Sequence, residues 1–175
     1  GADSFRITAS HADSPCFKIK ENPEIKEGPY VKLNVEAYGG MIVSTWLDRP
    51  LSVAGRLIVR ENGHLAQKLA AVDGTMLVIP SVAIHMDRNV NHKKDWNVQK
   101  DLLPLYGLAT EKTSFMDVIA ASAKVKPEDI LAHDLYLYSR VPGTIWGEEK
   151  EFISSPKLDD LQCAFATFRG FMRGR

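Results

Sequence analysis

A histidine and an aspartate lie two positions apart near the N-terminus, directly after a strand predicted over residues Phe5–Ser10. Imidazole is a common zinc ligand, and a carboxylate that accepts its second ring N–H fixes the tautomer of that ligand. His11 and Asp13 could therefore act together at a metal ion. Taken alone, the segment ending at Pro15 favours the alternative, a turn in which Asp13 and Ser14 bond local backbone groups.

Two adjacent carboxylates, Asp159 and Asp160, lie at the start of a helix that the apolar spacing predicts over about Leu158–Met172. Carboxylates in a first turn meet the positive end of the helix dipole, so simple capping is the favoured interpretation. In two-metal hydrolases, however, one carboxylate often bridges both cations. Asp159 and Asp160 are thus candidates for a bridging ligand.

A third candidate, His85, lies at the end of the apolar segment Thr75–Met86. An isolated histidine in such a place is more often a hydrogen-bonded structural residue than a functional one. The polar stretch that follows, Asp87–Lys100, is predicted to be a loop, and loops on rigid scaffolds often carry binding groups. The sequence leaves both interpretations of His85 open.

The composition excludes several kinds of partner. Lys plus Arg (22) and Asp plus Glu (22) cancel, so the chain has no basic surface for nucleic acid or for an anionic membrane. No apolar run is long enough to span a bilayer. Two distant cysteines do not make the framework of a small secreted domain, so we expect a cytoplasmic protein. Cys16 and Cys163 are predicted to be buried and inert, and His64, His92 and His133 to be solvated.

The elements that must position these side chains are mostly strands. Tyr30–Ala37 alternates apolar and polar side chains, which is the period of a half-buried strand. Asn62 and Gly63 tolerate positive φ and predict a tight hairpin between their flanking segments. Further strands are predicted at Cys16–Lys20, Met41–Leu47, Leu51–Arg60, Leu65–Val72 and Asp134–Tyr138.

One helix interrupts this pattern, because Phe115, Ile119 and Ala123 share a helical face that extends to about Val125. Either Thr113 or Ser114 is its predicted N-cap. Many strands at hairpin spacing with one inserted helix favour a barrel or a sandwich over a parallel α/β sheet.

Five ordered motifs give the chain a strong resemblance to the aspartyl aminopeptidase family. Their order and spacing match the family along nearly the whole chain, which is far more specific than any motif alone. The motifs are Ser10–Pro15, Asn34–Gly40, Thr45–Leu51, Ile79–His85 and Ser155–Leu161.

The resemblance implies a metalloaminopeptidase that uses two zinc ions per active site, with cobalt or manganese as substitutes, to remove N-terminal Asp or Glu from peptides. It implies that His11 ligates zinc, that Asp13 orients His11, and that Asp159 bridges the two ions. It implies that His85 reaches into the active site of a neighbouring subunit and contacts substrate. Enzymes of this family assemble through dimers into dodecamers, so a homo-oligomer is expected.

The fold implied is α+β and predominantly β. Residues 16–152 would form a Greek-key, barrel-like lid and dimerisation domain with a helical insertion. Residues 1–15 and 153–175 would be short pieces of an α/β catalytic domain, separated in sequence by the lid.

The sequence departs from the family pattern after Asp159. The adjacent glutamates expected further on, a general base and a ligand, are absent, and so are the later Asp and His ligands. We therefore expect this chain alone to be inactive and to bind no zinc. The alternative is that the chain is a non-catalytic oligomerisation or binding module. Asp160 is a second departure, because many relatives have Asn there, and it leaves open which carboxylate binds metal.

Overall fold

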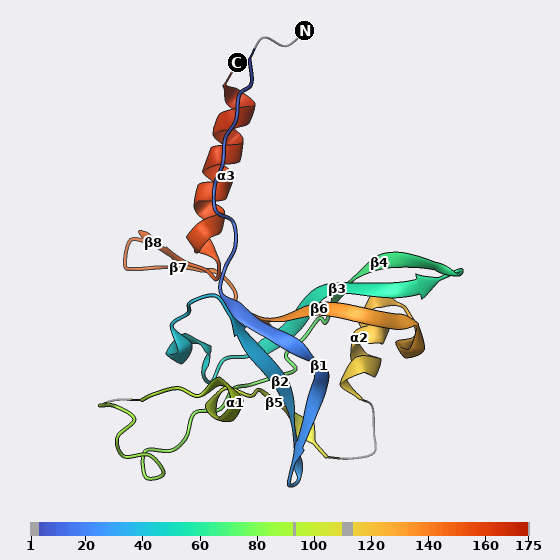
Figure 1. Ribbon diagram of the computed structural model, residues 1–175. Helices are drawn as coiled ribbons and strands as arrows, with labels where there is room; N and C mark the ends of the chain where they lie inside the picture. The colour runs from blue at the N-terminus through green and yellow to red at the C-terminus, as the bar shows by residue number, and fades with distance from the viewer. Residues whose placement is uncertain (1–3, 93, 110–113, 175) are drawn as a thin grey trace. The chain divides into compact units, whose positions relative to one another are not determined.

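A computed structural model of the chain describes residues 4–92, 94–109 and 114–174 (Figure 1). The chain divides into two compact units. One unit consists of residues 15–140, and the other combines the N-terminal residues up to 14 with residues from 141 onward.

The unit of residues 15–140 contains a six-stranded sheet in the order β4-β3-β6-β1-β2-β5, with every neighbouring pair antiparallel (Figure 1). The strands at its two ends are therefore β4 and β5. The six strands are β1 (Cys16–Glu27), β2 (Tyr30–Tyr38), β3 (Leu51–Glu61), β4 (His64–Ala71), β5 (Leu105–Leu108) and β6 (Ile130–Ser139).

Alternation of apolar and polar side chains sets the buried face of this sheet. In β2, the side chains of Val31, Leu33 and Val35 are buried, as the sequence pattern predicts. Burial of these branched side chains removes apolar area from water and stabilises the pairing of β2 with β1. The core also contains Phe17, Ile19, Leu51, Val53, Leu57, Val59, Leu77, Ile79, Leu102, Phe115, Ile119, Leu135 and Leu137.

A two-residue turn joins β3 to β4. Asn62 and Gly63 have φ values of 52° and 80°, the positive values that a tight hairpin turn of this hand requires. The strands then pair in continuous register from Glu61 opposite His64 to Ala54 opposite Ala71. The predicted hairpin is confirmed.

Helix α2 (Phe115–Ala123) begins at a complete capping box. The hydroxyl of Ser114 accepts the N–H of Asp117, and the carboxylate of Asp117 accepts the N–H of Ser114. Phe115 and Ile119 are buried, which confirms the predicted apolar face. Thr113, the other predicted cap, lies outside the described residues. The shorter helical elements are α1 (Val98–Asp101) and the 3₁₀ turns η1 (Val43–Trp46) and η2 (Pro127–Asp129).

Several expectations for this unit are wrong. Met41–Leu47 is not a strand, because Thr45 turns back and bonds the carbonyl of Ile42 through both its N–H and its hydroxyl, which forms η1. His133 is not solvated, because it lies on the buried face of β6 with Leu135 and Leu137. Cys16 is half-buried rather than fully buried.

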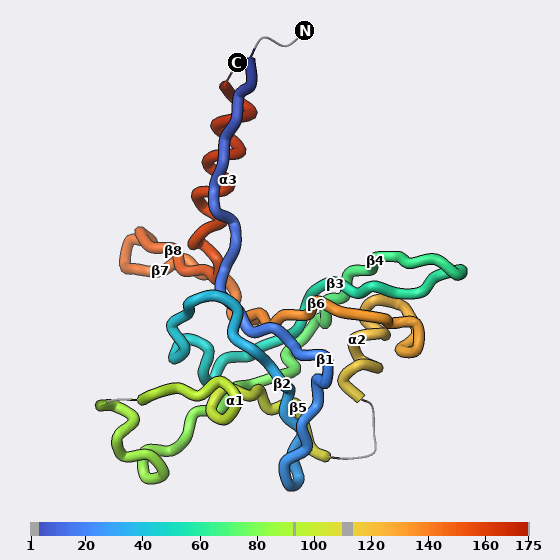
Figure 2. Tube along the Cα trace, viewed as in Figure 1, coloured from blue at the N-terminus to red at the C-terminus, as the bar shows by residue number. Residues whose placement is uncertain are grey.

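The other unit contains a hairpin of β7 (Thr144–Trp146) and β8 (Phe152–Ser154) and the helix α3 (Leu158–Arg173). The extended N-terminal segment, residues 4–14, runs beside α3 (Figure 2). The guanidinium of Arg6 donates to the carbonyl of Gly174 at 2.8 Å. The predicted strand Phe5–Ser10 has no strand partner among the described residues.

None of the described residues of this second unit is buried. Cys163 on α3 is exposed, so its predicted burial is wrong. Large apolar side chains of α3, including Phe165 and Phe168, are also exposed. The predicted helix itself is confirmed, since α3 matches the expected Leu158–Met172 to within one residue.

The expected predominance of β structure is confirmed, and the sheet is antiparallel. Among the described residues no pairing joins β4 to β5, so the Greek-key, barrel-like arrangement is not confirmed. Residues 141–152, which the expected boundaries place in the lid, group with the terminal residues. The assignment of residues 1–15, 16–152 and 153–175 to domains stays a prediction.

Candidate metal site

The site candidates His11, Asp13, Asp159 and Asp160 belong to the same compact unit, although about 150 positions separate them in sequence. The ring atom Nδ1 of His11 contacts the carboxylate of Asp160. The hydroxyl of Ser14 donates to the backbone carbonyl of Asp159 at 3.3 Å. The extended N-terminal segment is thereby held against the beginning of α3.

The backbone at the start of α3 places the two carboxylates differently. Lys157 has a left-handed φ of 64°, and Asp159 has the extended values φ −85° and ψ 112°, so regular helix begins only after it. The peptide between Asp159 and Asp160 is cis. Of the two carboxylates, that of Asp160 contacts His11.

The two carboxylates interact with each other. Hydrogen bonding with the Asp160 carboxylate raises the pKa of Asp159, and the charge of Asp160 acts in the same direction. The same hydrogen bond, followed by the contact with His11, lowers the pKa of Asp160. Close pairs of carboxylates repel when both are ionised, and a cation placed between them relieves that repulsion.

The donor atoms fit zinc in type but not in number. One imidazole and two carboxylates are ligands that zinc accepts in proteins, and a tetrahedral site needs four ligands. Among the described residues, no group of three or more His, Cys, Asp or Glu side chains is arranged to hold a metal ion. His11, Asp159 and Asp160 therefore offer donor types that zinc accepts, and among the described residues they do not form a metal site by themselves.

The structure gives Asp13 a local contact. One of its carboxylate oxygens accepts the N–H of Ser14 at 2.9 Å, which is the turn interaction that the sequence favoured on its own. The role of Asp13 in orienting His11 stays a prediction. Asp160 is the carboxylate that contacts His11. The sequence does not favour Asp160 over Asp159, and its only signal for Asp160 is that two carboxylates are adjacent.

His85 lies in the other unit, and its side chain is exposed. It is part of a turn in which the N–H of Met86 donates to the carbonyl of Ala83 at 2.8 Å. The segment before it is anchored to Asp48, whose carboxylate accepts the N–H of Ser81 at 2.9 Å and its hydroxyl at 2.6 Å. These bonds to Ser81, the hydroxyl first, lower the pKa of Asp48.

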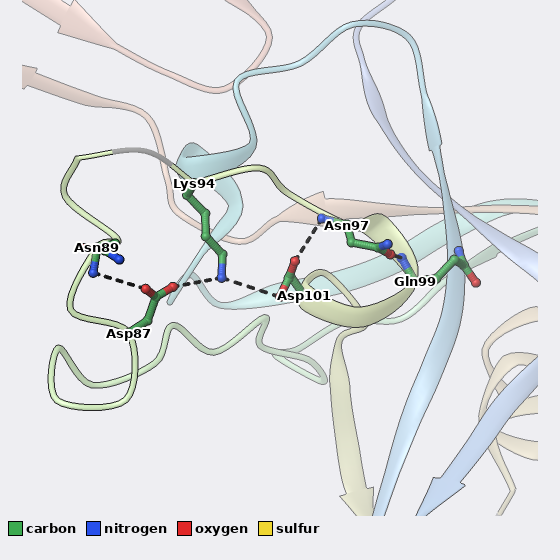
Figure 3. Close-up of polar contacts among 6 residues, drawn as sticks. All are labelled: Asp87, Asn89, Lys94, Asn97, Gln99 and Asp101. Atoms are coloured by element: carbon green, nitrogen blue, oxygen red, sulfur yellow. Dashed lines mark hydrogen bonds and ion pairs between the residues drawn. The ribbon is translucent and has the colours of Figure 1, made fainter.

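The segment after His85 is held by a group of polar contacts (Figure 3). The ammonium of Lys94 lies 3.0 Å from a carboxylate oxygen of Asp87 and 3.7 Å from one of Asp101. Hydrogen bonding with Asp87 is the main cause of the raised pKa of Lys94. Lys94 thus ties the loop to α1.

Helix α1 is itself fixed to the sheet. The side chain of Asn97 accepts the N–H of Gln99 at 3.0 Å, and the carboxylate of Asp101 accepts the N–H of Asn97 at 2.9 Å (Figure 3). The amide of Gln99 donates to the carbonyl of Val35 on β2 at 2.8 Å. The stretch Asp87–Lys100, predicted to be a loop, therefore ends in helix α1 (Val98–Asp101), and polar contacts fix its described residues to the β-rich unit.

Among the described residues, no helix combines the length and the apolar character needed to cross a membrane. Neither of the two described cysteines, Cys16 and Cys163, forms a disulfide.

Comparisons with known proteins agree on one family. Residues 1–174 match the sequence profile described as "Aminopeptidase I zinc metalloprotease (M18)". A protein of Clostridium novyi named "Probable M18 family aminopeptidase 2" is 43% identical over 175 residues, which cover 96% of this chain and 40% of that protein. The protein of the same name from Clostridium acetobutylicum is 43% identical over 178 residues, covering 98% of this chain and 41% of that protein.

Solved structures give the same result. The structure of Chaetomium thermophilum mApe1 is similar with a TM-score of 0.81 and 28% identity, over 94% of this chain and 41% of that chain. The structure of the S. cerevisiae mApe1 dodecamer is similar with a TM-score of 0.72 and 25% identity, over 90% of this chain and 36% of that chain. The chain thus spans about 40% of the length of the curated relatives it matches. With the profile matched along almost its whole length, this chain belongs to the M18 family of aminopeptidase I zinc metalloproteases.

Proposed function

We propose that this chain is the part of an M18 metalloaminopeptidase that supplies one side of the zinc site together with a lid and dimerisation domain. The observation that carries the proposal is the contact of His11 with Asp160, beside Asp159, within one compact unit. The full-length protein would be a cytoplasmic enzyme that removes N-terminal Asp or Glu from peptides. The resemblance of the five sequence motifs supports this substrate class.

In this proposal His11 ligates one zinc ion and Asp159 bridges two. Asp13 orients the imidazole, and Asp160 contacts it from the α3 side. Zinc, when bound, polarises the scissile carbonyl and makes water a stronger acid; cobalt or manganese would substitute. The carboxylate pair holds negative charge where the ions would bind.

The chain alone would be inactive, because the described residues complete no metal site. The test uses Asp- and Glu-anilide substrates with zinc, cobalt or manganese added. The purified 175-residue chain should give no turnover, and the full-length protein should cleave both substrates. Turnover by the isolated chain would contradict the inactive state, and a full-length protein without activity on either substrate would contradict the proposed substrate class.

Residues 16–152 would form the lid and dimerisation domain, and residues 1–15 and 153–175 the adjoining pieces of the catalytic domain. The separation of a β-rich unit from the unit that holds His11 supports this division. The relative from S. cerevisiae is described as a dodecamer, which supports a homo-oligomer here. Light scattering on the chain should detect a dimer or a larger species, and a strict monomer would contradict assembly through the lid.

His85 would contact substrate bound to a neighbouring subunit. The His85 side chain is exposed, and the bonds of Ser81 to Asp48 and of Lys94 to Asp87 hold the segment on either side of it. Both features support this role, because a binding group outside the catalytic domain must be held in place. In the full-length protein, His85→Ala should lower kcat/KM by at least about tenfold and leave the zinc content unchanged. Unchanged kinetics would reject the role.

A non-catalytic oligomerisation or binding module is the second candidate. It is favoured by one observation, the lack of a complete group of metal ligands among the described residues. The two candidates differ in the full-length protein, since only the first predicts hydrolysis of an acidic anilide that stops when the metal is chelated.

A further inference from the structure

The segment that carries His85 leaves the hydrophobic core at Ile79. The side chain of Ile79 is fully buried, whereas every residue from 80 to 86 is exposed. The next buried residue along the chain is Leu102, and no described residue between the two is buried. Burial of apolar surface is the dominant favourable term in folding, and residues 80–86 lack it. Polar contacts must therefore hold this segment.

Asp48 makes three hydrogen bonds to the chain at the point where it leaves the core. Its N–H donates to the carbonyl of Ile79 at 2.9 Å. One of its carboxylate oxygens accepts the N–H of Ser81 at 2.9 Å, and the other accepts the Ser81 hydroxyl at 2.6 Å. Because both oxygens are used, the backbone and the side chain of Ser81 are fixed together.

Asp48 is itself tied to the six-stranded sheet. It precedes β3, which begins at Leu51. The N–H of Leu51 donates to the carbonyl of Leu77 at 2.9 Å, and both side chains are buried. An isolated parallel bridge also joins Leu47 to Ile79. The sheet thus supports Asp48 from both sides, and Asp48 in turn supports the exposed chain that follows Ile79.

The backbone at position 48 limits the residues that could replace Asp48. Its φ is 56°, in the left-handed region that most residues with a Cβ avoid and that aspartate and asparagine enter more easily. The hydrogen bonds from Ser81, that of the hydroxyl first, lower the pKa of the Asp48 carboxyl. Asp48 therefore combines an unusual backbone conformation with two ionised acceptor atoms.

Two segments that are distant in sequence meet at this contact. Asp48 belongs to the motif Thr45–Leu51, and Ser81 belongs to the motif Ile79–His85. On the other side of His85, Lys94 and Asp87 both belong to the stretch that follows it (Figure 3). Support from a separate, sheet-bound segment therefore reaches His85 from the side of Ser81.

We propose that Asp48 is a positioning residue, which acts through Ser81 to hold the segment that presents His85. Asp48 touches neither substrate nor metal, and its effect on turnover passes through His85. This inference rests on the proposed contact of His85 with substrate bound to a neighbouring subunit. It adds that this contact depends on a hydrogen-bonded pair outside the active site, because a binding group is effective only when it is held in its productive position.

Three substitutions remove these hydrogen bonds in steps. Asp48→Ala removes both acceptors and places a less tolerant residue at a positive φ. Ser81→Ala removes only the bond of the hydroxyl. Asp48→Asn is the conservative variant, because asparagine tolerates this φ, its amide oxygen can accept the N–H of Ser81, and its NH₂ can donate to the hydroxyl. Ser44→Ala, at an exposed serine of η1, is the matched control for Ser81→Ala.

The first test is a double-mutant cycle in the full-length protein with an Asp-anilide substrate. Asp48→Ala should lower kcat/KM about five- to tenfold, Ser81→Ala about two- to fivefold, and Asp48→Asn less than about twofold. The loss should divide between kcat and KM as it does for His85→Ala, with the zinc content unchanged. In the His85→Ala background, Asp48→Ala should lower kcat/KM by less than about twofold. A merely structural role would give the same loss in both backgrounds.

The second test measures the order of the segment without any activity. In the 175-residue chain, the backbone ¹⁵N order parameters of residues 82–86 should fall from about 0.85 to below about 0.6 in Asp48→Ala. They should fall less in Ser81→Ala and stay unchanged in Ser44→Ala. Because Ser81→Ala removes a single hydroxyl, it tests the inference even if Asp48→Ala does not fold.

The two tests separate this inference from the function on which it rests. Unchanged order parameters in Asp48→Ala and Ser81→Ala, or equal kinetic losses with and without His85, would overturn the positioning role. If His85→Ala lowers kcat/KM and neither Asp48→Ala nor Ser81→Ala does, the positioning role fails and the substrate contact of His85 stands. If His85→Ala leaves the kinetics unchanged, the substrate contact fails, and the effect of Asp48 on turnover is rejected with it.

Discussion

The carboxylate of Asp160 contacts Nδ1 of His11 across 149 positions of sequence. The contact joins the extended N-terminal segment to the beginning of α3. The Ser14 hydroxyl adds a second link by donating to the backbone of Asp159. Both ends of the chain thus contribute to one set of zinc-type donors.

The two neighbouring carboxylates should differ in importance. In the full-length protein, Asp159→Asn should lower kcat/KM at least about 100-fold more than Asp160→Asn, because only Asp159 is proposed to bridge the metals. Zinc content measured by mass spectrometry should fall in the same order. The opposite order would identify Asp160 as the ligand and Asp159 as its neighbour.

Lys94 should control the order of the segment that carries His85. Lys94→Met keeps the apolar part of the side chain but removes the ion pairs with Asp87 and Asp101. Amide hydrogen exchange in this segment should then accelerate at least about tenfold. Lys100→Met, a nearby exposed lysine, is the matched control and should not change exchange. Equal exchange in both variants would show that Lys94 does not hold the segment.

Asp134 should make a pH-dependent contribution to the free energy of unfolding. The hydrogen bond from Arg56, at 2.5 Å, and then that from Lys18 lower the pKa of Asp134 in the folded chain. A lowered folded pKa stabilises the fold above the unfolded value of about 3.9, and the contribution is lost as the pH falls below it.

Asp134→Asn should therefore reduce the free energy of unfolding by up to about 1 kcal/mol at pH 7, since the carboxylate is one-third exposed, and by less at pH 3. Urea denaturation at both pH values measures the difference. Asp73→Asn is the control, because Asp73 pairs with Arg140 but its side chain is 96% exposed. A loss of the same size at both pH values would contradict the assignment.

Glycine at position 55 should be needed for β3 and β6 to pair closely. A methyl group at this position would collide with the backbone carbonyl of Asp134. Gly55→Ala should therefore cost about 1–3 kcal/mol of unfolding free energy in urea denaturation. Gly107→Ala, where a methyl group meets open space, should be close to neutral. Equal unfolding free energies of the two variants would mean that β3 and β6 can move apart to accommodate the methyl group with no loss of stability.

Local patterns predicted the parts of the fold in which one physical signal dominates. Alternation identified β2, two residues that tolerate positive φ identified the turn between β3 and β4, and a candidate N-cap at Thr113 or Ser114 indicated the start of α2. The pattern was misleading at Met41–Leu47, where hydrogen bonds from Thr45 to Ile42 replace strand pairing. Period-two alternation with Leu135 and Leu137 would have placed His133 on the buried face.

The candidate site could be predicted less well from the sequence than the fold could. His11 and Asp159 have ordinary local explanations, a turn and a helix start, and only the ordered family motifs joined them. The partner of His11 depends on the backbone at Lys157 and Asp159, which directs one of two adjacent carboxylates toward the ring. No local spacing rule distinguishes those carboxylates.

The most direct test of the central claim is the zinc content and the turnover of an Asp-anilide by the full-length protein, with and without His11→Ala. The unaltered protein should contain zinc and cleave the substrate. The His11→Ala variant, with unchanged circular dichroism, should lose its zinc and at least about 100-fold in kcat/KM. A variant that keeps both its zinc and its turnover would contradict the proposed role of His11 as a zinc ligand.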